Sequence, residues 1–459
     1  MLDELKIKYR QRLFDPFVTL WAFLSQVLDI EYCLKNKGQA CFKDLLTTTD
    51  NTDDEACPLF LATAPSDKSC HNAVSRVIAY LVSEKVELPS TDSSAYCQAR
   101  SRLPEELLQK LFGKVAQSLE EKVTAEYLWC GRNVKVIDGS SVSMPDTVEN
   151  QKAYPQPKNQ NLGCGFPIAK IGVIFSLATG AAIALASDVL NTHDLKLARR
   201  LYGFLNPKDV LLGDRAFCSY ADLIAIKNLG CDAVFRKHQS RKTPMRKGKI
   251  IGDCDKLVTW YKPKKCPQGL SEEEFLTLPS TLMREIYYYI IIPGFRTQRV
   301  SLITTLLDTT KYSKLEVLRL SGERWNVELD LKHLKTTLGM EILRCKTPQM
   351  VHKELYVYLL AYNLLRTLMW SAGTTYDTPA LHLSMLGTRH HFTHFICVLL
   401  TADFTQRHHI YRTLLKVIVH KSVPERPGRS EPRVRKRRPK AYSLMKQPRH
   451  EYAVQLQTA

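Results

Sequence analysis

The sequence lacks the cysteine patterns of a zinc ribbon and of a disulfide-stapled domain. It has no C-x-x-C pair, and its 13 cysteines are an odd number. This usage fits a reducing cytoplasm better than an oxidising compartment. The first residues, MLDELKIKYRQRLF, are charged and contain no apolar run of the signal-peptide kind. Internal repeats are absent as well. We therefore expect a cytoplasmic protein.

A membrane-spanning helix is not expected either, although one uncharged run needs a decision. Residues 171–187, IGVIFSLATGAAIALAS, are barely long enough to cross a bilayer. Gly180 interrupts the run near its middle, and no basic anchors follow it. Two buried strands joined at Thr179 and Gly180 explain the pattern better. We predict no contact with a membrane.

The sequence has few acidic residues relative to basic ones. The chain has 65 Lys and Arg against 46 Asp and Glu, which gives a net charge of +19. This excess suits a polyanion such as nucleic acid, although a basic protein can simply be soluble. The tail, residues 421–459, is the most basic part: residues 421–450 hold 11 Lys or Arg and 2 Asp or Glu. We expect a disordered or extended arm, either merely solvated or in contact with phosphates.

At 459 residues the chain should form two or three domains, and the first, residues 1–125, is predicted to be all-helical. Near its end, Ser90 and Thr91 are good helix-capping residues ahead of the segment AYCQARSRLP. A helix, a short break and a second helix carrying Gln98, Arg100 and Arg102 are typical of a helix-turn-helix that contacts DNA. The alternative is an ordinary pair of surface helices.

Residues 126–236 change to an α/β pattern. Short β-type runs occupy residues 134–137, 168–187, 210–212 and 232–236. Helical segments are expected after Asp194 and at residues 220–229. The order of strand, hairpin, helix, strand and helix predicts the first part of an α/β core.

Residues 237–299 interrupt this order. They alternate in β fashion between proline breaks, which predicts a β-rich insertion that contains Trp260. Residues 300–420 then supply a further strand at 300–307 and several helices. They are interpreted as the second part of the core.

One helix in this second part, within residues 321–340, has a charged face. On an ideal helix Arg324, Glu328 and Lys335 lie within about 40° of one another. An apolar stripe beside them would seat the helix on a core; it consists of Leu320, Val327, Leu331, Leu334 and Leu338. Asp330 is expected on the opposite side, toward solvent. The alternative to a functional face is a surface ladder of ion pairs.

Three acids together suggest a catalytic site. Asp138 and Asp214 each end an apolar, strand-like run, and strand ends line the active crevice of an α/β sheet. Glu328 could converge on them from its helix. Three carboxylates in one cleft need a cation, and oxygen-only ligands suit Mg²⁺ or Mn²⁺. Two such ions would serve a phosphodiester displacement. Taken alone, each aspartate could equally cap a turn.

Three stretches in this order, VIDGSSVSMPD, VLLGDRAFCSYADL and RW-x-x-E with a later Lys, resemble the DDE transposases of the insertion sequence 4 family. The resemblance implies an α/β, RNase H-like catalytic core with a β-rich insertion, preceded by an all-α domain. The family signature is Tyr, two residues, Arg, three residues, Glu, six residues, Lys. Arg324, Glu328 and Lys335 match it, whereas Ser321 stands at the Tyr position.

The resemblance also implies a function. The expected protein binds the terminal inverted repeats of an insertion sequence and carries out Mg²⁺-dependent strand cleavage and strand transfer into target DNA. It would act as a homodimer on paired DNA ends in the bacterial nucleoid. The catalytic and metal residues would be Asp138, Asp214 and Glu328. DNA contacts would come from Arg324, Lys335, Arg215, Gln98, Arg100, Arg102 and Trp260.

Three alternatives stay open at this point. Trp260 could stack on a displaced base, as the family analogy suggests, or could be a tryptophan of a β-sheet core. The whole protein could be an RNase H-like nuclease that cuts without joining. It could also be a non-enzymatic DNA-binding protein descended from a transposase, although an intact set of three acids argues against that.

Overall fold

The computed structural model describes residues 13–29, 68–83, 90–238, 248–266, 271–290, 298–423 and 443–458. It divides into two compact units. We call Met1–Phe112 with His352–Arg429 the helical unit, and Gly113–Val351 with Ser430–Ala459 the sheet unit. Each unit is described by itself.

The helical unit begins with a small three-helix core. Its helices are α1 (Pro16–Leu28), α3 (Cys70–Ser83) and α4 (Ser94–Arg102), and α5 (Glu105–Glu120) follows. Asp15 caps α1 by accepting a hydrogen bond from the backbone N–H of Val18, and proline at the first helical position fixes the entry of the chain. The core contains Ala22, Ala73, Val74, Val77 and Tyr96. The predicted succession of helix, break and helix before residue 102 therefore exists.

The C-terminal helices belong to this same unit. They are α12 (Pro348–Thr375), α13 (Met385–Thr401) and α14 (Phe404–Val419), with a short 3₁₀ turn at Ala380–His382. Lys353 donates a hydrogen bond of 2.6 Å to the backbone carbonyl of Ser101, and Lys68 lies 5.4 Å from the ring of Tyr358. The sequence pattern predicts that residues 300–420 belong to the α/β core, whereas contacts group His352–Arg429 with the N-terminal helices. Sequence periodicity identifies a helix without identifying its partners.

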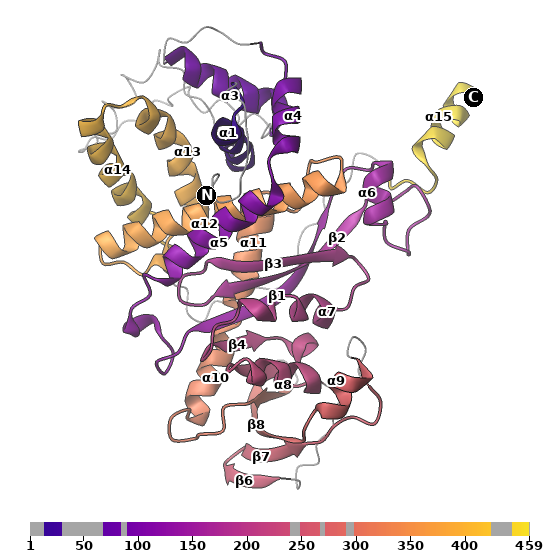
Figure 1. Cartoon of the computed structure of the whole chain (residues 1–459), viewed down its shortest axis with the longest axis vertical. Coiled ribbons are helices and arrows are strands. Elements are labelled where there is room, and N and C mark those ends of the chain that lie inside the picture. The colour runs from indigo at the N-terminus through magenta and orange to yellow at the C-terminus, as the bar shows by residue number, and fades with distance from the viewer. Residues whose placement is uncertain are drawn as a thin grey trace, which may run out of the picture. The chain divides into compact units, whose positions relative to one another are not determined.

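The sheet unit is built on nine strands in the order β3-β2-β1-β4-β5-β9-β8-β7-β6 (Figure 1). The strands are β1 (Val134–Ser143), β2 (Ile168–Ser176), β3 (Ala182–Val189), β4 (Val210–Gly213), β5 (Asp232–Arg236), β6 (Lys249–Gly252), β7 (Asp255–Trp260), β8 (Thr281–Ile290) and β9 (Gln298–Thr304). Strands β1, β2 and β3 form an antiparallel meander. Strands β4 and β5 run parallel to β1. The mixed α/β class is confirmed.

The uncharged run at residues 171–187 lies in β2 and β3, as predicted. The chain turns between them at Gly180, whose φ of 68° favours glycine. No helix among the described residues is long and apolar enough to cross a membrane.

The predicted β-rich insertion does not form a sheet of its own. Its strands β6, β7 and β8 continue the main sheet through β9, which pairs with both β8 and β5. The extension contains a buried ion pair in which Arg284 donates to Asp255 at 2.5 Å, and it also contains the short helix α9 (Glu272–Thr277). The insertion therefore lengthens one edge of the core sheet.

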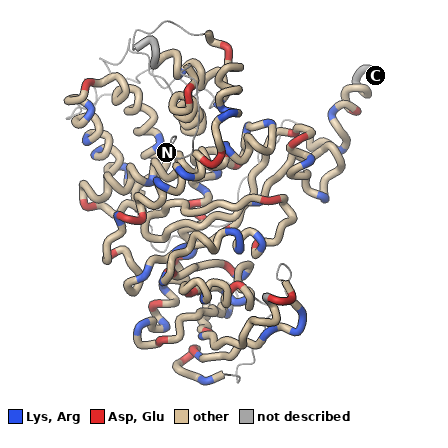
Figure 2. The backbone as a smooth tube through the Cα atoms, in the orientation of Figure 1, with Lys and Arg blue, Asp and Glu red and all other residues tan. Residues whose placement is uncertain are grey.

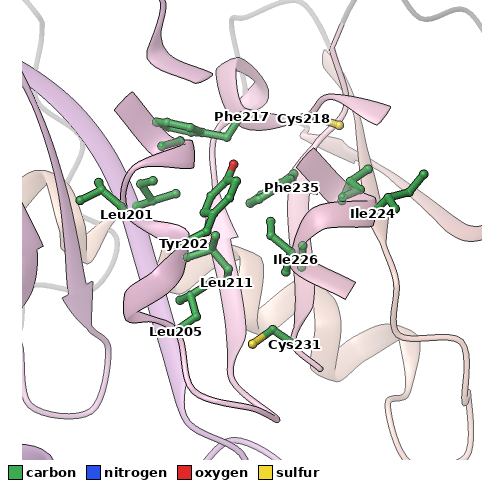
Figure 3. Close-up of a cluster of buried hydrophobic side chains, with 14 of the residues drawn as sticks. Leu201, Tyr202, Leu205, Leu211, Phe217, Cys218, Ile224, Ile226, Cys231 and Phe235 are labelled. Atoms are coloured by element: carbon green, nitrogen blue, oxygen red, sulfur yellow. The ribbon is translucent and has the colours of Figure 1, made fainter. Parts of the chain in front are cut away.

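Helices cover both faces of the sheet. On one face lie α7 (Asp194–Arg199), a 3₁₀ turn at Tyr202–Phe204, and α8 (Tyr220–Asn228), packed on the cluster drawn in Figure 3. Arg199 of α7 makes two hydrogen bonds of 2.9 Å to the buried Asp222 of α8, which ties these helices together. On the other face, α10 (Lys314–Glu323) packs on β5 and α11 (Asn326–Lys332) packs on β1.

The segment at residues 321–340 is not the single helix that we predicted. Helix α10 ends at Glu323, α11 starts at Asn326, and a π-helical turn follows at His333–Thr337, closed by a bond of 2.9 Å from the N–H of Leu338 to the carbonyl of His333. The apolar stripe is buried as expected. Asp330 was expected in solvent but is only 7% exposed. Asp330 lies within α11, three residues after the buried Val327 and next to the buried Leu331, so it borders the apolar stripe rather than opposing it.

Three smaller elements and the tail complete the sheet unit. They are 3₁₀ turns at Ala125–Tyr127 and Arg215–Phe217 and helix α6 (Val148–Ala153). Most of the predicted basic arm, residues 424–442, lies outside the described residues. After residue 442 the chain is described again. The carbonyl of Lys446 accepts a hydrogen bond of 2.7 Å from the side chain of Asn161, and helix α15 (Arg449–Thr458) follows.

Candidate active site

Asp138 and Asp214 lie on neighbouring parallel strands at the same level. The pairing of β1 with β4 ends with Ile137 opposite Gly213, so each aspartate is the next residue on its strand. Neighbouring strands are about 4.8 Å apart, which places the two side chains within reach of one small ion. Strand β1 itself continues to Ser143 along β2, where Asp138 is paired with Val173. Strand β1 therefore does not end at Asp138, as its apolar run suggests; only its pairing with β4 ends just before this residue.

Gly213 fixes the position of Asp214. A Cβ atom at residue 213 would lie 2.9 Å from Cε1 of Phe235 and 3.1 Å from Cγ2 of Ile137. The absence of a side chain allows β4 to sit tightly between its neighbours just before Asp214. After Asp214 the chain turns at once, because the N–H of Phe217 donates to the carbonyl of Asp214 at 3.1 Å. The sequence Gly213-Asp214-Arg215 is thus a close-packed strand end.

Glu328 reaches the site from the helical layer. It lies on α11, which packs on β1. Ile137 belongs to the core cluster on the α7 and α8 face, so the next residue, Asp138, points to the α11 face, because side chains alternate along a strand. Arg324 donates to Oε1 of Glu328 at 3.1 Å, and these side chains are 23% and 39% exposed. The ion pair orients Glu328 beside the strand-borne aspartates.

The charges of Asp214, Arg324 and Glu328 all influence the pKa of Asp138. Its carboxylate accepts a hydrogen bond of 2.7 Å from the N–H of Gly139. The pKa of Asp138 is raised to about 6, mainly by burial and to a smaller extent by the charges of Glu328 and Asp214. The hydrogen bond from Gly139 and the charge of Arg324 act in the opposite direction. The three predicted acids therefore interact electrostatically.

The carboxylates are close but are not drawn together around one point. Within the described ranges, no group of three His, Cys, Asp or Glu side chains is placed to hold a metal ion. Glu328 is instead engaged by the guanidinium of Arg324. Arg324 supplies the local positive charge in this arrangement.

The two other predicted phosphate ligands flank the acids differently. Lys335 lies in the π-helical turn and is 4.0 Å from Glu341. Arg215 is exposed and lines a cavity together with Asp214. Ser321, at the position of the family tyrosine, lies on α10, one turn before Arg324.

The predicted DNA contacts of α4 separate into two kinds. Gln98 and Arg102 are exposed and lie four residues apart, on one side of the helix. Arg100 instead points into the helical unit. Its guanidinium donates to Oε1 of Gln26 at 3.2 Å and lies 4.9 Å from the ring of Phe23. The structure thus gives Arg100 contacts within the helical unit, and its contact with DNA stays a prediction.

Trp260 lies in the hydrophobic core of the sheet unit. Its side chain is 3% exposed and packs in the core cluster with Val258 and Met283, so its ring is not available for stacking on a base. The core interpretation of this tryptophan is the one that the structure supports. Sequence reasoning overlooked Trp325, which is 55% exposed and adjoins Arg324. Its place between the charged residues of the signature, rather than on the apolar stripe, was the available signal.

Comparison with known sequences identifies the family of the chain. The chain belongs to the transposase DDE domain family, which matches residues 129–364, just over half of its length. The matched range contains Asp138, Asp214 and Glu328. This membership confirms the family that the motifs indicated.

Two known proteins are similar to the chain. Transposase InsG for insertion sequence element IS4 of Escherichia coli (strain K12) is 29% identical over 286 residues, which are 61% of this chain and 61% of that relative. The chain thus aligns with less than two thirds of its relative. A piggyBac transposase in a synaptic complex with hairpin DNA matches over 91% of this chain and 87% of that chain, at 10% identity and a TM-score of 0.39. That likeness is too low to support conclusions about mechanism.

Proposed function

We propose that the chain is a DNA transposase that cuts DNA at the ends of an insertion sequence and joins the freed 3′ ends to target DNA. One observation carries the proposal. Asp138 and Asp214 follow directly upon the last paired residues of two parallel strands, and Glu328 lies on the helix packed against the first of them. The family membership supports the same activity.

The fold proposal is an RNase H-like core. The strand order β3-β2-β1-β4-β5, with an antiparallel meander followed by two parallel strands, supports it. The right place for a site in such a sheet is the carboxyl ends of the parallel strands, where Asp214 lies. Strands β6 to β9 would then be an extension of this core.

The proposed cofactor is Mg²⁺ or Mn²⁺, held by Asp138, Asp214 and Glu328. The donor set fits, because it consists of carboxylate oxygens alone and because burial, together with the charges of Glu328 and Asp214, raises the pKa of Asp138, an effect that a bound cation would oppose. When bound, such ions activate a water or a 3′-hydroxyl and stabilise the leaving oxygen of a phosphodiester.

The protein side chains have separate tasks in this proposal. Asp138 and Asp214 are fixed by the backbone of the sheet and define where the scissile phosphate sits. Arg324 orients Glu328 and adds positive charge for a neighbouring phosphate, since guanidinium groups bind phosphates well. Lys335 and Arg215 bind the DNA strand on either side. The exposed ring of Trp325 is suited to stack on a base there.

The proposed partners are the terminal inverted repeats and the target DNA. Gln98 and Arg102 on α4 would contact the repeats, helped by the basic tail. Two DNA ends must be processed together, so we expect a homodimer on paired ends. We also expect the protein to be cytoplasmic and associated with the nucleoid.

The test uses the full chain and duplexes taken from both flanks of its gene. Asp138→Asn, Asp214→Asn and Glu328→Gln should each lower Mg²⁺-dependent cleavage by about a thousandfold, because each removes charge stabilisation worth several kcal/mol. Binding of the same duplexes, measured by gel shift, should persist. Glu323→Gln is the matched control: it removes an exposed carboxylate that accepts from Asn326 at 2.8 Å and should leave cleavage unchanged.

The products separate the proposal from its rivals. Joined products in a strand-transfer assay support a transposase. Nicked ends that are never joined would indicate a nuclease, and binding without metal-dependent cleavage in the unaltered chain would indicate a non-enzymatic DNA-binding protein. Full cleavage by any one of the three variants would remove that residue from the site.

A further inference from the structure

A cavity of about 530 Å³ opens beside Asp214, on the α7 side of the sheet. It is lined by His193, Asp194, Leu195, Asp214, Arg215, Ala216, Cys218, Ser219 and His238. These residues come from the start of α7, the segment between β4 and α8, and the end of β5. Its size is that of a small-molecule site. The cavity therefore shares one wall with the candidate active site and extends away from it.

The walls of the cavity offer hydrogen-bond donors of the kind that bind phosphate. Of the described residues that line it, Arg215 is the one arginine, and His193 and His238 add imidazole groups. Nδ1 of His193 accepts from the N–H of Leu195 at 3.3 Å, so the ring proton of the neutral form is on Nε2, ready to donate. Ser219, the capping residue of the nine-residue helix α8, also lines the cavity, but its hydroxyl donates to the buried carboxylate of Asp222, which already serves that helix N-terminus.

The one acid that lines the cavity besides Asp214 is compensated. Asp194 forms an ion pair of 2.8 Å with Lys170. Its Oδ1 atom also lies 3.1 Å from where a Cβ atom of residue 139 would be, so Gly139 leaves the room for this carboxylate. Asp194 is thereby held against β1, one residue from Asp138, and its charge is offset by Lys170 and does not repel an anion in the cavity.

The other cations nearby are engaged elsewhere. Figure 2 shows basic residues gathered along α7, but Arg199 is paired with Asp222, and Lys196 and Arg200 both face Asp188 at 3.8 and 3.5 Å. These side chains do not line the cavity. Phosphate binding there would thus depend on Arg215 and the two histidines and not on the general basic surface of the helix.

We propose that this cavity is a nucleotide subsite: it takes one nucleotide of the strand being cut, with its phosphate bound by Arg215, His193 and His238 while the neighbouring phosphate lies at the carboxylates. This inference rests on the proposed function, since it assigns a further part of the same substrate. It makes His193 and His238 positioning residues for the DNA strand. They act by binding and take no part in the transfer of protons or phosphate.

The experiment combines protein variants with single neutral linkages in the DNA. The full chain is titrated, without metal so that nothing is cut, with a fluorescent duplex from the flank of its gene. One methylphosphonate is placed at successive positions around the cleavage point. In the unaltered chain, one linkage should weaken binding by about tenfold, as loss of a charge-assisted contact would. Arg215→Gln should weaken binding of the natural duplex equally and should then be insensitive to that linkage.

Matched variants control for charge and folding. Lys196→Gln removes one positive charge from α7, where the side chain is 71% exposed, and should change affinity by less than about twofold. His193→Ser keeps a residue that can cap α7 but is too short to reach a phosphate. It and His238→Ala should lose sensitivity to the same linkage as Arg215→Gln. Circular dichroism and melting temperatures check that each variant is folded.

The outcomes are distinct. Equal weakening by Lys196→Gln and Arg215→Gln, or equal sensitivity at every linkage in the variants and the unaltered chain, overturns the subsite. If the unaltered chain cuts and joins DNA while these results appear, only the subsite is lost. If the unaltered chain neither binds nor cuts DNA, the proposed function itself fails.

Discussion

The strand-borne and the helix-borne parts of the candidate site are built differently. Asp138 and Asp214 are placed by backbone pairing, one residue beyond Ile137 and Gly213. Glu328 is placed by a side-chain ion pair with Arg324 on a helical segment that is interrupted on both sides. The backbone of a sheet has little freedom, whereas an ion pair between partly exposed side chains is weak and exchangeable. The candidate site therefore has a rigid half, which holds Asp138 and Asp214, and an adjustable half, which holds Arg324 and Glu328.

The largest effect is expected where the rigid half is most tightly packed. Gly213→Ala places a methyl group 2.9 Å from Phe235, so it should lower the free energy of unfolding by about 2 kcal/mol, the usual cost of overpacking. Urea denaturation measures this. Gly322→Ala on α10 is the contrasting change, since nothing lies within 4 Å of the new Cβ. It should stabilise by up to about 1 kcal/mol through helix propensity. Similar destabilisation by both changes would contradict the distinction.

The second effect concerns the carboxylate of Asp138 and its contribution to the free energy of unfolding. Because the folded-state pKa of Asp138 is raised to about 6 from 3.8, the folded protein binds more protons than the unfolded chain between these values. The carboxyl group therefore costs stability as pH rises through this window. Asp138→Asn should stabilise the metal-free protein by about 1–2 kcal/mol above pH 6 and should have no such effect near pH 4.

Thermal melts of the two proteins at pH 4 and pH 7, in the presence of a chelator, measure this difference. The same variant should be inactive, so a gain in stability would accompany the loss of function. A stabilisation that did not depend on pH would mean that Asp138 is not strained by its surroundings.

The smallest effect is expected in the adjustable half. Arg324→Ala should change the free energy of unfolding by less than about 1 kcal/mol, because the pair with Glu328 is partly exposed. It should nevertheless lower cleavage by about tenfold, since Glu328 loses its orientation. Arg324→Lys should restore part of the activity. Cleavage rates and urea denaturation on the same preparations compare the two. A large loss of stability would place Arg324 in the scaffold instead.

Much of the rigid half was predictable from local patterns. Apolar runs that end in Asp138 and Asp214 identify strand ends, and the uncharged run at residues 171–187 identifies a hairpin. The pattern could not predict the register of these strands. Ile137 pairs with Gly213, and this pairing depends on close packing around a residue that has no side chain. The continuation of the sheet through the insertion also depends on long-range pairing, between β9 and β5.

The adjustable half was predicted less well. The apolar stripe through Val327 and Leu334 is buried as its spacing indicates. The break near Arg324 and the π turn at His333–Thr337 have no signature in helical periodicity. The burial of Asp330 was missed although it lies on α11 beside Val327 and Leu331. Arg100 and Trp260 show the same limit. Residue type suggests a nucleic-acid contact, but only tertiary packing decides whether the side chain faces solvent.

The π-helical turn has an evolutionary consequence. Such a turn is equivalent to one extra amino acid inserted into an α-helix. Deleting a single codon within residues 333–337 would restore a regular helix and rotate everything before it by about 100° relative to everything after it. Lys335 and the buried Leu338 could then no longer both keep their places. Relatives with a one-residue gap at this point should therefore carry their basic side chain at a shifted position.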